Sequence, residues 1–170
     1  MRGGRRADAR KWDDFVYFFK GPDYVRWNIW EDEVDTGPKP IKGNWRGVPD
    51  HFASGIDSAV EWGDGNYYMT KGSEYVRFNK ALDKVDRGPV PIKGNWVGIP
   101  SAFESGFDSM VRWPDGTVYI TRGADYVGYS TVDDKAVGGA KPIKGNWPDV
   151  SGAFETGFDA AVFWGEFHVI

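Results

Sequence analysis

One pentapeptide, IKGNW, occurs three times in this chain, at residues 41–45, 92–96 and 143–147, with a constant step of 51 residues. The repeat extends well beyond the pentapeptide. Residues 37–87 align with residues 88–138 without gaps, and 26 of the 51 positions are identical. A unit that recurs at this length buries its apolar face only by packing against its neighbours. The chain is therefore expected to fold as a tandem array of like units.

Within one unit the residue pattern is typical of short antiparallel strands. Residues 56–62 alternate between apolar and polar side chains, as in a half-buried strand. Asp64-Gly65 then predicts a hairpin turn, because glycine adopts positive φ at little cost. Residues 67–70 and 74–78 form the next two predicted strands, separated by a turn at Lys71-Gly72. The following unit repeats the order turn, strand, turn, strand at Asp115-Gly116, 118–121, Arg122-Gly123 and 125–129.

Each unit ends with an edge strand and a short linker. The motif Gly-Pro-x-Pro-Ile at 37–41 and 88–92 suits an outer strand, where a missing N–H breaks no ladder hydrogen bond. Residues 45–55 and 96–106 then place proline where a helical turn begins and glycine where it ends. Three or four antiparallel strands with such a linker, repeated about every 50 residues, are typical of a propeller blade. The linkers should be anchored in the core by Phe52, Phe103 and Phe154.

The motifs together resemble the hemopexin-type repeat. The resemblance rests on the run from Phe107-Asp108 to Trp113, on Asp115-Gly116 and Asp125-Tyr126, and on the Pro-x-Pro-Ile and Asn-Trp motifs that follow. It covers nearly the whole chain, from residue 15 to residue 164. Within that family the chain is most similar to disulfide-free members such as hemopexin-like plant seed albumins and their bacterial and fungal relatives. The resemblance implies an all-β fold, a small propeller that has four blades in the family.

The number of units departs from that family pattern. Residue 15 aligns with residue 66, so the chain enters its first unit at the second strand. Residues 158–164 read as a first strand with little after it, and they are expected to pair with the N-terminal unit. Three outcomes remain open: a three-bladed ring in one chain, a six-bladed ring from two chains that exchange strands, or an incomplete four-bladed domain. The expected organisation is a disordered basic tail over 1–12 and one domain over 13–170, with units 56–106, 107–157, and 158–164 plus 13–55.

Composition excludes several classes of protein. There is no cysteine, which excludes a disulfide scaffold, a thiolate metal site and a thiol nucleophile, and which weakly favours the cytoplasm. The first 11 residues contain five basic residues and one acidic residue, so the remaining residues carry a net charge of −8 where the whole chain carries −4. An acidic body disfavours nucleic acid as a partner. No apolar run is long enough to span a bilayer, and the N-terminal residues do not resemble a secretory signal, so no membrane partner is expected.

The candidate metal site is a set of three aspartates that recur at the start of the first strand of a unit, Asp57, Asp108 and Asp159. The family resemblance implies that this position lines a central tunnel and that main-chain carbonyls there hold calcium or sodium. Oxygen ligands suit such ions. The aspartate side chains are expected to accept hydrogen bonds from backbone amides in the neighbouring turns. A three-bladed ring would offer one protein oxygen fewer than the family pattern.

The other aromatic and histidine residues fit less specific roles. Two sets of tryptophans recur with the repeat and are interpreted as core residues, whereas Trp30 lies in an acidic loop and is a candidate contact residue. His51 and His168 have no partner at metal-ligand spacing, so haem held by two histidines is not expected. Surface haem or polyamine binding, as among seed albumins, stays open, and the loop Glu31-Asp32-Glu33 would suit a polyamine. The two recurring sets are Trp45, Trp96 and Trp147, and Trp62, Trp113 and Trp164.

The functional hypothesis is a hemopexin-like module that binds a small molecule or a protein, as a monomer or a strand-exchanged homodimer, with a cation in the central tunnel. No catalytic motif of a hydrolase or phosphate loop is present, and no catalytic residue is assigned. The alternative is a pocket enzyme of specialised metabolism, similar to fungal pericyclic-reaction catalysts of the family, which would need no motif. Gly128 and residues 138–140 break the repeat in the third unit, which could open such a pocket.

Overall fold

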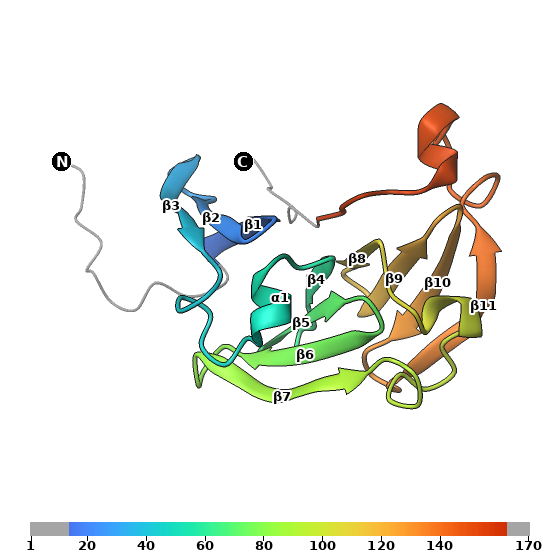
Figure 1. Cartoon of the computed structure of the whole chain (residues 1–170). Helices are drawn as coiled ribbons and strands as arrows, with labels where there is room; N and C mark the ends of the chain where they lie inside the picture. The colour runs from blue at the N-terminus through green and yellow to red at the C-terminus, as the bar shows by residue number, and fades with distance from the viewer. Residues whose placement is uncertain (1–13, 163–170) are drawn as a thin grey trace.

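The computed structural model describes residues 14–162 as three antiparallel sheets that follow one another around a common centre (Figure 1). The first sheet has the order β1-β2-β3, the second β4-β5-β6-β7 and the third β11-β10-β9-β8. The strands of the first sheet are β1 (Phe15–Lys20), β2 (Asp23–Asn28) and β3 (Glu33–Pro40). Those of the second are β4 (Ser58–Glu61), β5 (Asn66–Lys71), β6 (Glu74–Asn79) and β7 (Lys84–Pro91). Those of the third are β8 (Ser109–Arg112), β9 (Thr117–Arg122), β10 (Asp125–Ser130) and β11 (Lys135–Pro142).

The sheets confirm the predicted all-β repeat, and the first sheet begins at its second strand, as the alignment indicated. The proline-rich strands β3, β7 and β11 lie at the outer edge of their sheets. The expected pairing of residues 158–164 with the N-terminal unit is not confirmed, because residues 158–162 are not in a strand and the described strands form no closed sheet. A strand needs a partner edge for its backbone hydrogen bonds, and this segment pairs with none of the described strands. The basic tail at residues 1–12 lies outside the described residues, as does residue 164.

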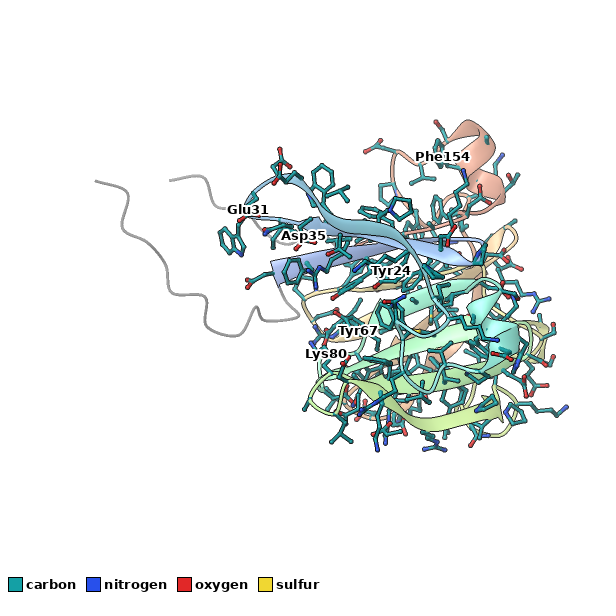
Figure 2. All side chains as sticks on the ribbon, turned by 60° about the vertical axis from the view of Figure 1, so that its left-hand side comes forward. Tyr24, Glu31, Asp35, Tyr67, Lys80 and Phe154 are labelled. Atoms are coloured by element: carbon teal, nitrogen blue, oxygen red, sulfur yellow. The ribbon has the colours of Figure 1, made fainter. Side chains whose placement is uncertain are left out.

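A single helical turn links each sheet to the next segment of the chain. The turns are α1 (Asp50–Ala53), η2 (Ser101–Phe103) and η3 (Gly152–Thr156). Pro49 and Pro100 precede the first two, because a proline ring presets φ for helix entry and the missing N–H is not needed there. Phe52 and Phe103 anchor their turns in the core, with exposed fractions of 0% and 1%. Phe154 does not, since 64% of its side chain is exposed (Figure 2).

Consecutive sheets pack through a recurring aromatic contact. The ring of Trp45, in the linker after the first sheet, lies 4.9 Å from that of Phe78 in the second sheet. The equivalent ring of Trp96 lies 5.1 Å from Tyr129 in the third sheet. Edge-on aromatic pairs of this kind add to the stabilisation from buried area. The repeat therefore forms the same aromatic contact between consecutive sheets twice, and each contact is here called a joint.

Three tryptophans of the two recurring sets are buried at these joints, and two, both in the third unit, are not. Trp45, Trp62 and Trp96 are buried, as the core interpretation predicted. Trp113 is 46% exposed, because no further sheet covers its face in the described structure. Trp147 is half-buried for the same reason.

A buried hydroxyl pair ties the inner strand of each complete sheet to the next strand. The Oγ of Ser58 lies 3.0 Å from Thr70 Oγ1, and the Oγ of Ser109 lies 2.7 Å from Thr121 Oγ1. All four side chains are buried. A buried hydroxyl is costly unless it is hydrogen-bonded, so each pair holds the register of its inner strand.

The outer strands are tied by an ion pair that two units possess and the third lacks. Arg77 Nε donates to Asp86 Oδ1 at 2.8 Å, and this hydrogen bond lowers the pKa of the Asp86 carboxyl. Arg26 makes the same contact with Asp35. The third unit has Gly128 at the arginine position. This replacement leaves little empty space, because a Cβ there would lie only 3.4 Å from Thr117 Cγ2.

No helix among residues 14–162 is both long and apolar enough to cross a membrane.

Candidate functional site

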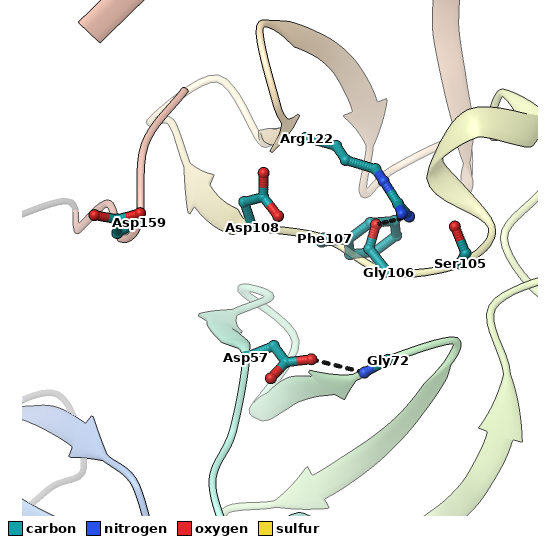
Figure 3. Close-up of a pocket in the computed structure, with 8 residues that line it drawn as sticks. All are labelled: Asp57, Gly72, Ser105, Gly106, Phe107, Asp108, Arg122 and Asp159. Atoms are coloured by element: carbon teal, nitrogen blue, oxygen red, sulfur yellow. Dashed lines mark hydrogen bonds between the residues drawn. The ribbon is translucent and has the colours of Figure 1, made fainter. Parts of the chain in front are cut away.

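The three candidate aspartates line one open pocket of about 330 Å³ near the start of the inner strands (Figure 3). Asp57 directly precedes β4 and Asp108 directly precedes β8, which explains why the repeat brings them together. Asp159 reaches the same pocket from the segment after η3. The remaining lining residues are Gly72, Ser105, Gly106, Phe107 and Arg122.

Two of the aspartate side chains brace hairpin turns, as the sequence predicted. Asp57 Oδ2 accepts a hydrogen bond from the Gly72 amide at 2.7 Å. Asp108 Oδ2 accepts one from the Gly123 amide at 2.6 Å. Both amides belong to the turn after the second strand of the sheet. Each carboxylate therefore holds the tip of its own sheet at the pocket.

The main-chain groups of Asp57 and Asp108 lie beside these carboxylates. The amides of Asp57 and Asp108 donate to the carbonyls of Thr70 and Thr121, both at 2.9 Å. Within residues 14–162 no backbone hydrogen bond outside the regular ladders ends on the carbonyl oxygen of either aspartate. Main-chain carbonyl oxygens are suitable ligands for a hard cation. The donor set thus fits the kind of ion that the family resemblance implies.

Basic side chains around the pocket were not predicted as part of the site. Lys71 Nζ donates to the Gly55 carbonyl at 2.6 Å, and an Arg122 Nη donates to the Gly106 carbonyl at 2.9 Å. Each bond ties the turn of one sheet to the linker that precedes that sheet. A basic residue followed by glycine recurs at Lys20, Lys71 and Arg122 in the sequence, and this recurrence was the signal that could have found them.

The side chains that line the pocket carry a net negative formal charge, and Lys71 Nζ lies beside them, 4.0 Å from Asp57 Oδ1. Three carboxylates and the Arg122 guanidinium line the pocket, which leaves a formal charge of −2. Among the described residues, however, no three histidine or acidic side chains are grouped closely enough to chelate a metal by themselves. Any ion at this site would therefore depend on main-chain oxygens as well as on carboxylates.

The histidines do not add to the site. His51 Nε2 lies 2.9 Å from Glu74 Oε2 at the surface. His168 lies outside the described residues.

Trp30 is exposed, as expected for a contact residue, with 66% of its side chain accessible. Its Nε1 donates to Asp14 Oδ1 at 2.9 Å, which holds the indole beside the exposed acidic residues 31–33.

Comparisons with known proteins identify the family. A family model described as Hemopexin matches residues 9–50 and 56–101, just over half of the chain. Matrix metalloproteinase-19 of Mus musculus is 40% identical over 65 residues, which are 38% of this chain. The match spans only 11% of that metalloproteinase. The similarity to this curated relative is thus confined to a small part of its length.

Solved structures show the same fold over most of the chain. The hemopexin fold protein CP4 from cow pea matches with a TM-score of 0.77 and 27% identity, over 90% of this chain and 74% of that one. A 2S albumin seed protein from Dolichos matches with a TM-score of 0.77 and 26% identity, over 93% and 75%. A plant lectin with two metal binding sites from Cicer arietinum has a TM-score of 0.73 and 21% identity over 90% and 75%, a similarity that shows the fold alone. The repeat, the sheets and the matched residues agree, and the chain belongs to the hemopexin family.

Proposed function

We propose that this protein is a hemopexin-type binding module that holds a cation, calcium in preference to sodium, in the pocket of Asp57, Asp108 and Asp159. The module binds a small molecule or a protein, and exposed Trp30 is a candidate contact for that ligand. The observation that carries the proposal is the convergence of three repeated aspartates, from three separate segments, on one pocket.

The choice of calcium follows from charge and ligand type. A pocket lined by side chains with a formal charge of −2, with main-chain oxygens beside them, suits a hard divalent ion. Magnesium demands a tighter octahedral shell and gives up water reluctantly, so an open pocket built from the ends of strands suits it less well. Sodium would leave the carboxylates only partly neutralised.

Calcium is expected to stabilise the folded protein. At a calcium concentration about a hundredfold above Kd, the gain in free energy of unfolding is about 2.7 kcal/mol, which corresponds to a rise in Tm of about 5 to 10 °C in a chain of this size. Differential scanning fluorimetry of protein stripped with a chelator, titrated separately with calcium, magnesium and sodium chlorides at constant ionic strength, measures this shift.

Two asparagine substitutions provide the variant and its control. Asp108→Asn keeps an acceptor for the Gly123 amide but removes a pocket charge, so it should weaken the calcium affinity at least about tenfold. Asp64→Asn alters an aspartate that also accepts from a backbone amide, that of Asn66 at 3.0 Å, but lies outside the pocket lining. It should leave the affinity unchanged. An equal loss in both variants, or no calcium shift in the parent protein, would contradict the proposed site.

We also propose that residues 158–162 complete the first sheet by pairing with β1. In the second sheet Ser58, Ala59 and Val60 pair with Thr70, Met69 and Tyr68. By the repeat, Ala160, Ala161 and Val162 would face Phe19, Phe18 and Tyr17. In Figure 1 the segment after η3 runs across the open side of the arc toward the first sheet.

The side chains at these positions support that register. Where two units place a buried serine opposite a threonine, the split unit has Ala160 and Phe19, so no hydroxyl would be buried without its partner. Where the second unit has Ala59 opposite Met69, the split unit has Ala161 opposite Phe18. A small residue thus meets a large one in both units, which suits dense packing. The first sheet and this segment therefore depart from the other units at positions that would face each other, as expected for paired strands.

The pairing is testable by cross-linking, because the parent chain has no cysteine. The double variant Phe18→Cys, Ala161→Cys should form a disulfide under mild oxidation, since facing residues in adjacent strands bring their Cβ atoms to about 5 Å. The control Phe18→Cys, Val162→Cys shifts one cysteine to the opposite face of its strand and should stay largely reduced. Quantification of thiols and electrophoresis without reductant read out the bond, within or between chains. No bond in the first variant, or equal bonding in both, would refute the pairing.

A further inference from the structure

At opposite ends of the array of sheets, two apolar faces carry side chains that are exposed or half-buried in the described part of the chain. The first is the face of the third sheet that carries ring stacks around Trp147, here called the trailing face. Its residues are Trp113, Tyr119, Tyr126, Trp147, Phe154 and Phe158. The second is the opposite face of the first sheet, here called the leading face. Its residues are Phe18, Val25, Trp27 and Val34.

The trailing face is a copy of surfaces that are buried inside the chain. Trp147 lies 5.4 Å from Tyr126 and 5.9 Å from Tyr119, as Trp96 lies 5.7 Å from Tyr75 and 6.0 Å from Tyr68. The two clusters are therefore built alike. In the second unit the cluster is covered by the third sheet, and Phe103 is 1% exposed. In the third unit nothing among the described residues covers it, and the equivalent Phe154 is 64% exposed.

The leading face is likewise a copy of surfaces that are buried inside the chain. Phe18 occupies the position of Met69 and Ile120, which are 1% and 0% exposed because the preceding unit packs on them. Phe18 itself is 43% exposed. Trp27 occupies the position of Phe78 and Tyr129, the residues that receive Trp45 and Trp96.

We propose that the trailing face of one copy packs against the leading face of a second copy of this chain, head to tail. The contact would repeat the two internal joints, with Trp147 of one copy packed against Trp27 of the other. This proposal rests on the strand pairing proposed above and assigns that pairing to two chains rather than one. A contact between two different faces is heterologous, so it closes into a ring or continues as an open array according to its rotation.

Polar groups at the edge of the joint fit the same arrangement. Lys71 and Arg122 each donate to the carbonyl of the linker glycine that precedes their sheet, Gly55 and Gly106. By the repeat, Lys20 would donate to Gly157, and Lys20 is exposed. In the proposed contact, Lys20 on the leading face of one copy would therefore donate a hydrogen bond to the Gly157 carbonyl at the end of the third unit of the other copy.

The rest of the fold favours a second copy over closure within one chain. The linker glycines fix neighbouring sheets at close range, since a Cβ on Gly106 would lie 2.9 Å from the carbonyl oxygen of Gly72. Packing the first sheet directly onto the third would require a change in the angle between sheets at the two internal joints. In addition, the chain covers 74% of the cow pea protein, so about a quarter of that protein has no counterpart in the alignment. A second copy docks without disturbing either internal joint.

Light scattering after size-exclusion chromatography of two complementary variants tests the proposal. Phe18→Glu blocks only the leading face and Phe154→Glu only the trailing face, and both replace exposed side chains. The parent chain at about 100 μM should have a mass of at least twice 19.1 kDa, and each variant alone should return to 19.1 kDa. An equimolar mixture should form a 1:1 pair, because each variant retains the face that the other lacks. Leu82→Glu, at a side chain that is 50% exposed elsewhere, should behave as the parent chain.

The outcomes separate this proposal from the strand pairing. A parent chain that stays at 19.1 kDa, a multimer that both variants retain, or variants that fail to associate when mixed would each overturn the head-to-tail contact. Circular dichroism of each variant establishes that a loss of mass reflects lost association and not unfolding. If the Phe18→Cys, Ala161→Cys disulfide forms within single chains only, the strand pairing stands and the second copy is excluded. If no disulfide forms at all, the pairing itself fails.

Discussion

Replacing Phe103 by alanine is expected to lower the free energy of unfolding by about 4 kcal/mol, the usual cost of deleting a large aromatic side chain from a packed core. Phe103 is 1% exposed and joins the cluster that holds the second sheet against the third. In a chain of this size the loss corresponds to a fall in Tm of about 10 °C. Urea denaturation followed by tryptophan fluorescence measures the free energy directly.

The repeat supplies its own control for this experiment. Phe154 occupies the same position in the next unit but is 64% exposed, so its replacement by alanine should cost less than about 1 kcal/mol. The measurement belongs at low protein concentration, where association between copies does not contribute. Equal losses at the two positions would show that a further layer covers Phe154 within a single chain.

A second large effect is expected for Gly106→Ala, with a loss of about 3 kcal/mol in the free energy of unfolding. The φ of Gly106 is +140°, a conformation that costs a residue with a side chain about 1 to 3 kcal/mol. The new Cβ would also lie 2.9 Å from the backbone oxygen of Gly72, closer than carbon and oxygen tolerate. Since Gly106 lines the aspartate pocket, the same variant should bind calcium more weakly.

Gly94→Ala separates the two causes. Gly94 also has a positive φ, +78°, but a Cβ there would meet no atom within 4 Å. Only the conformational cost then applies, and the expected loss is about 1 kcal/mol. Thermal and chemical denaturation of both variants give the comparison. If Gly106→Ala were no worse than Gly94→Ala, the close approach between the linker and the turn would not be a rigid part of the joint.

The strands and turns could be predicted from the sequence because their signals are local and occur three times. Asp64-Gly65 and Lys71-Gly72 delimit β5 on both sides, and the proline motif marks the outermost strand. Repetition removes the ambiguity that a single short apolar run carries, since a chance pattern does not recur at a constant step. The linker turns were predicted for the same reason.

The repeat misled the prediction where the environment of a unit, and not its sequence, decides. Phe52, Phe103 and Phe154 are identical residues at equivalent positions, yet among residues 14–162 a neighbouring sheet covers the first two and none covers the third. Residues 158–162 alternate like the strands 58–61 and 109–112, but a strand forms only beside a partner edge. Burial and pairing in the last unit of an array therefore depend on its neighbours, which its own residues do not encode.

The candidate site was predicted in part. The aspartates were found from their recurrence, and the bracing of turns by Asp57 and Asp108 is confirmed. Arg122 was missed, because a basic residue before a glycine indicates only a turn until the fold shows that it reaches the preceding linker.

The joint between Trp96 and Tyr129 has a consequence for how proteins of this kind change in length. The trailing face of the last unit has the same residues as the face on which the following sheet packs in the second unit. A further module could therefore pack on it in the same way. Gain or loss of a whole module by unequal recombination would then leave the remaining joints between sheets unchanged. Since the faces at both ends duplicate buried ones, such a chain can be extended at either end without change to an existing joint.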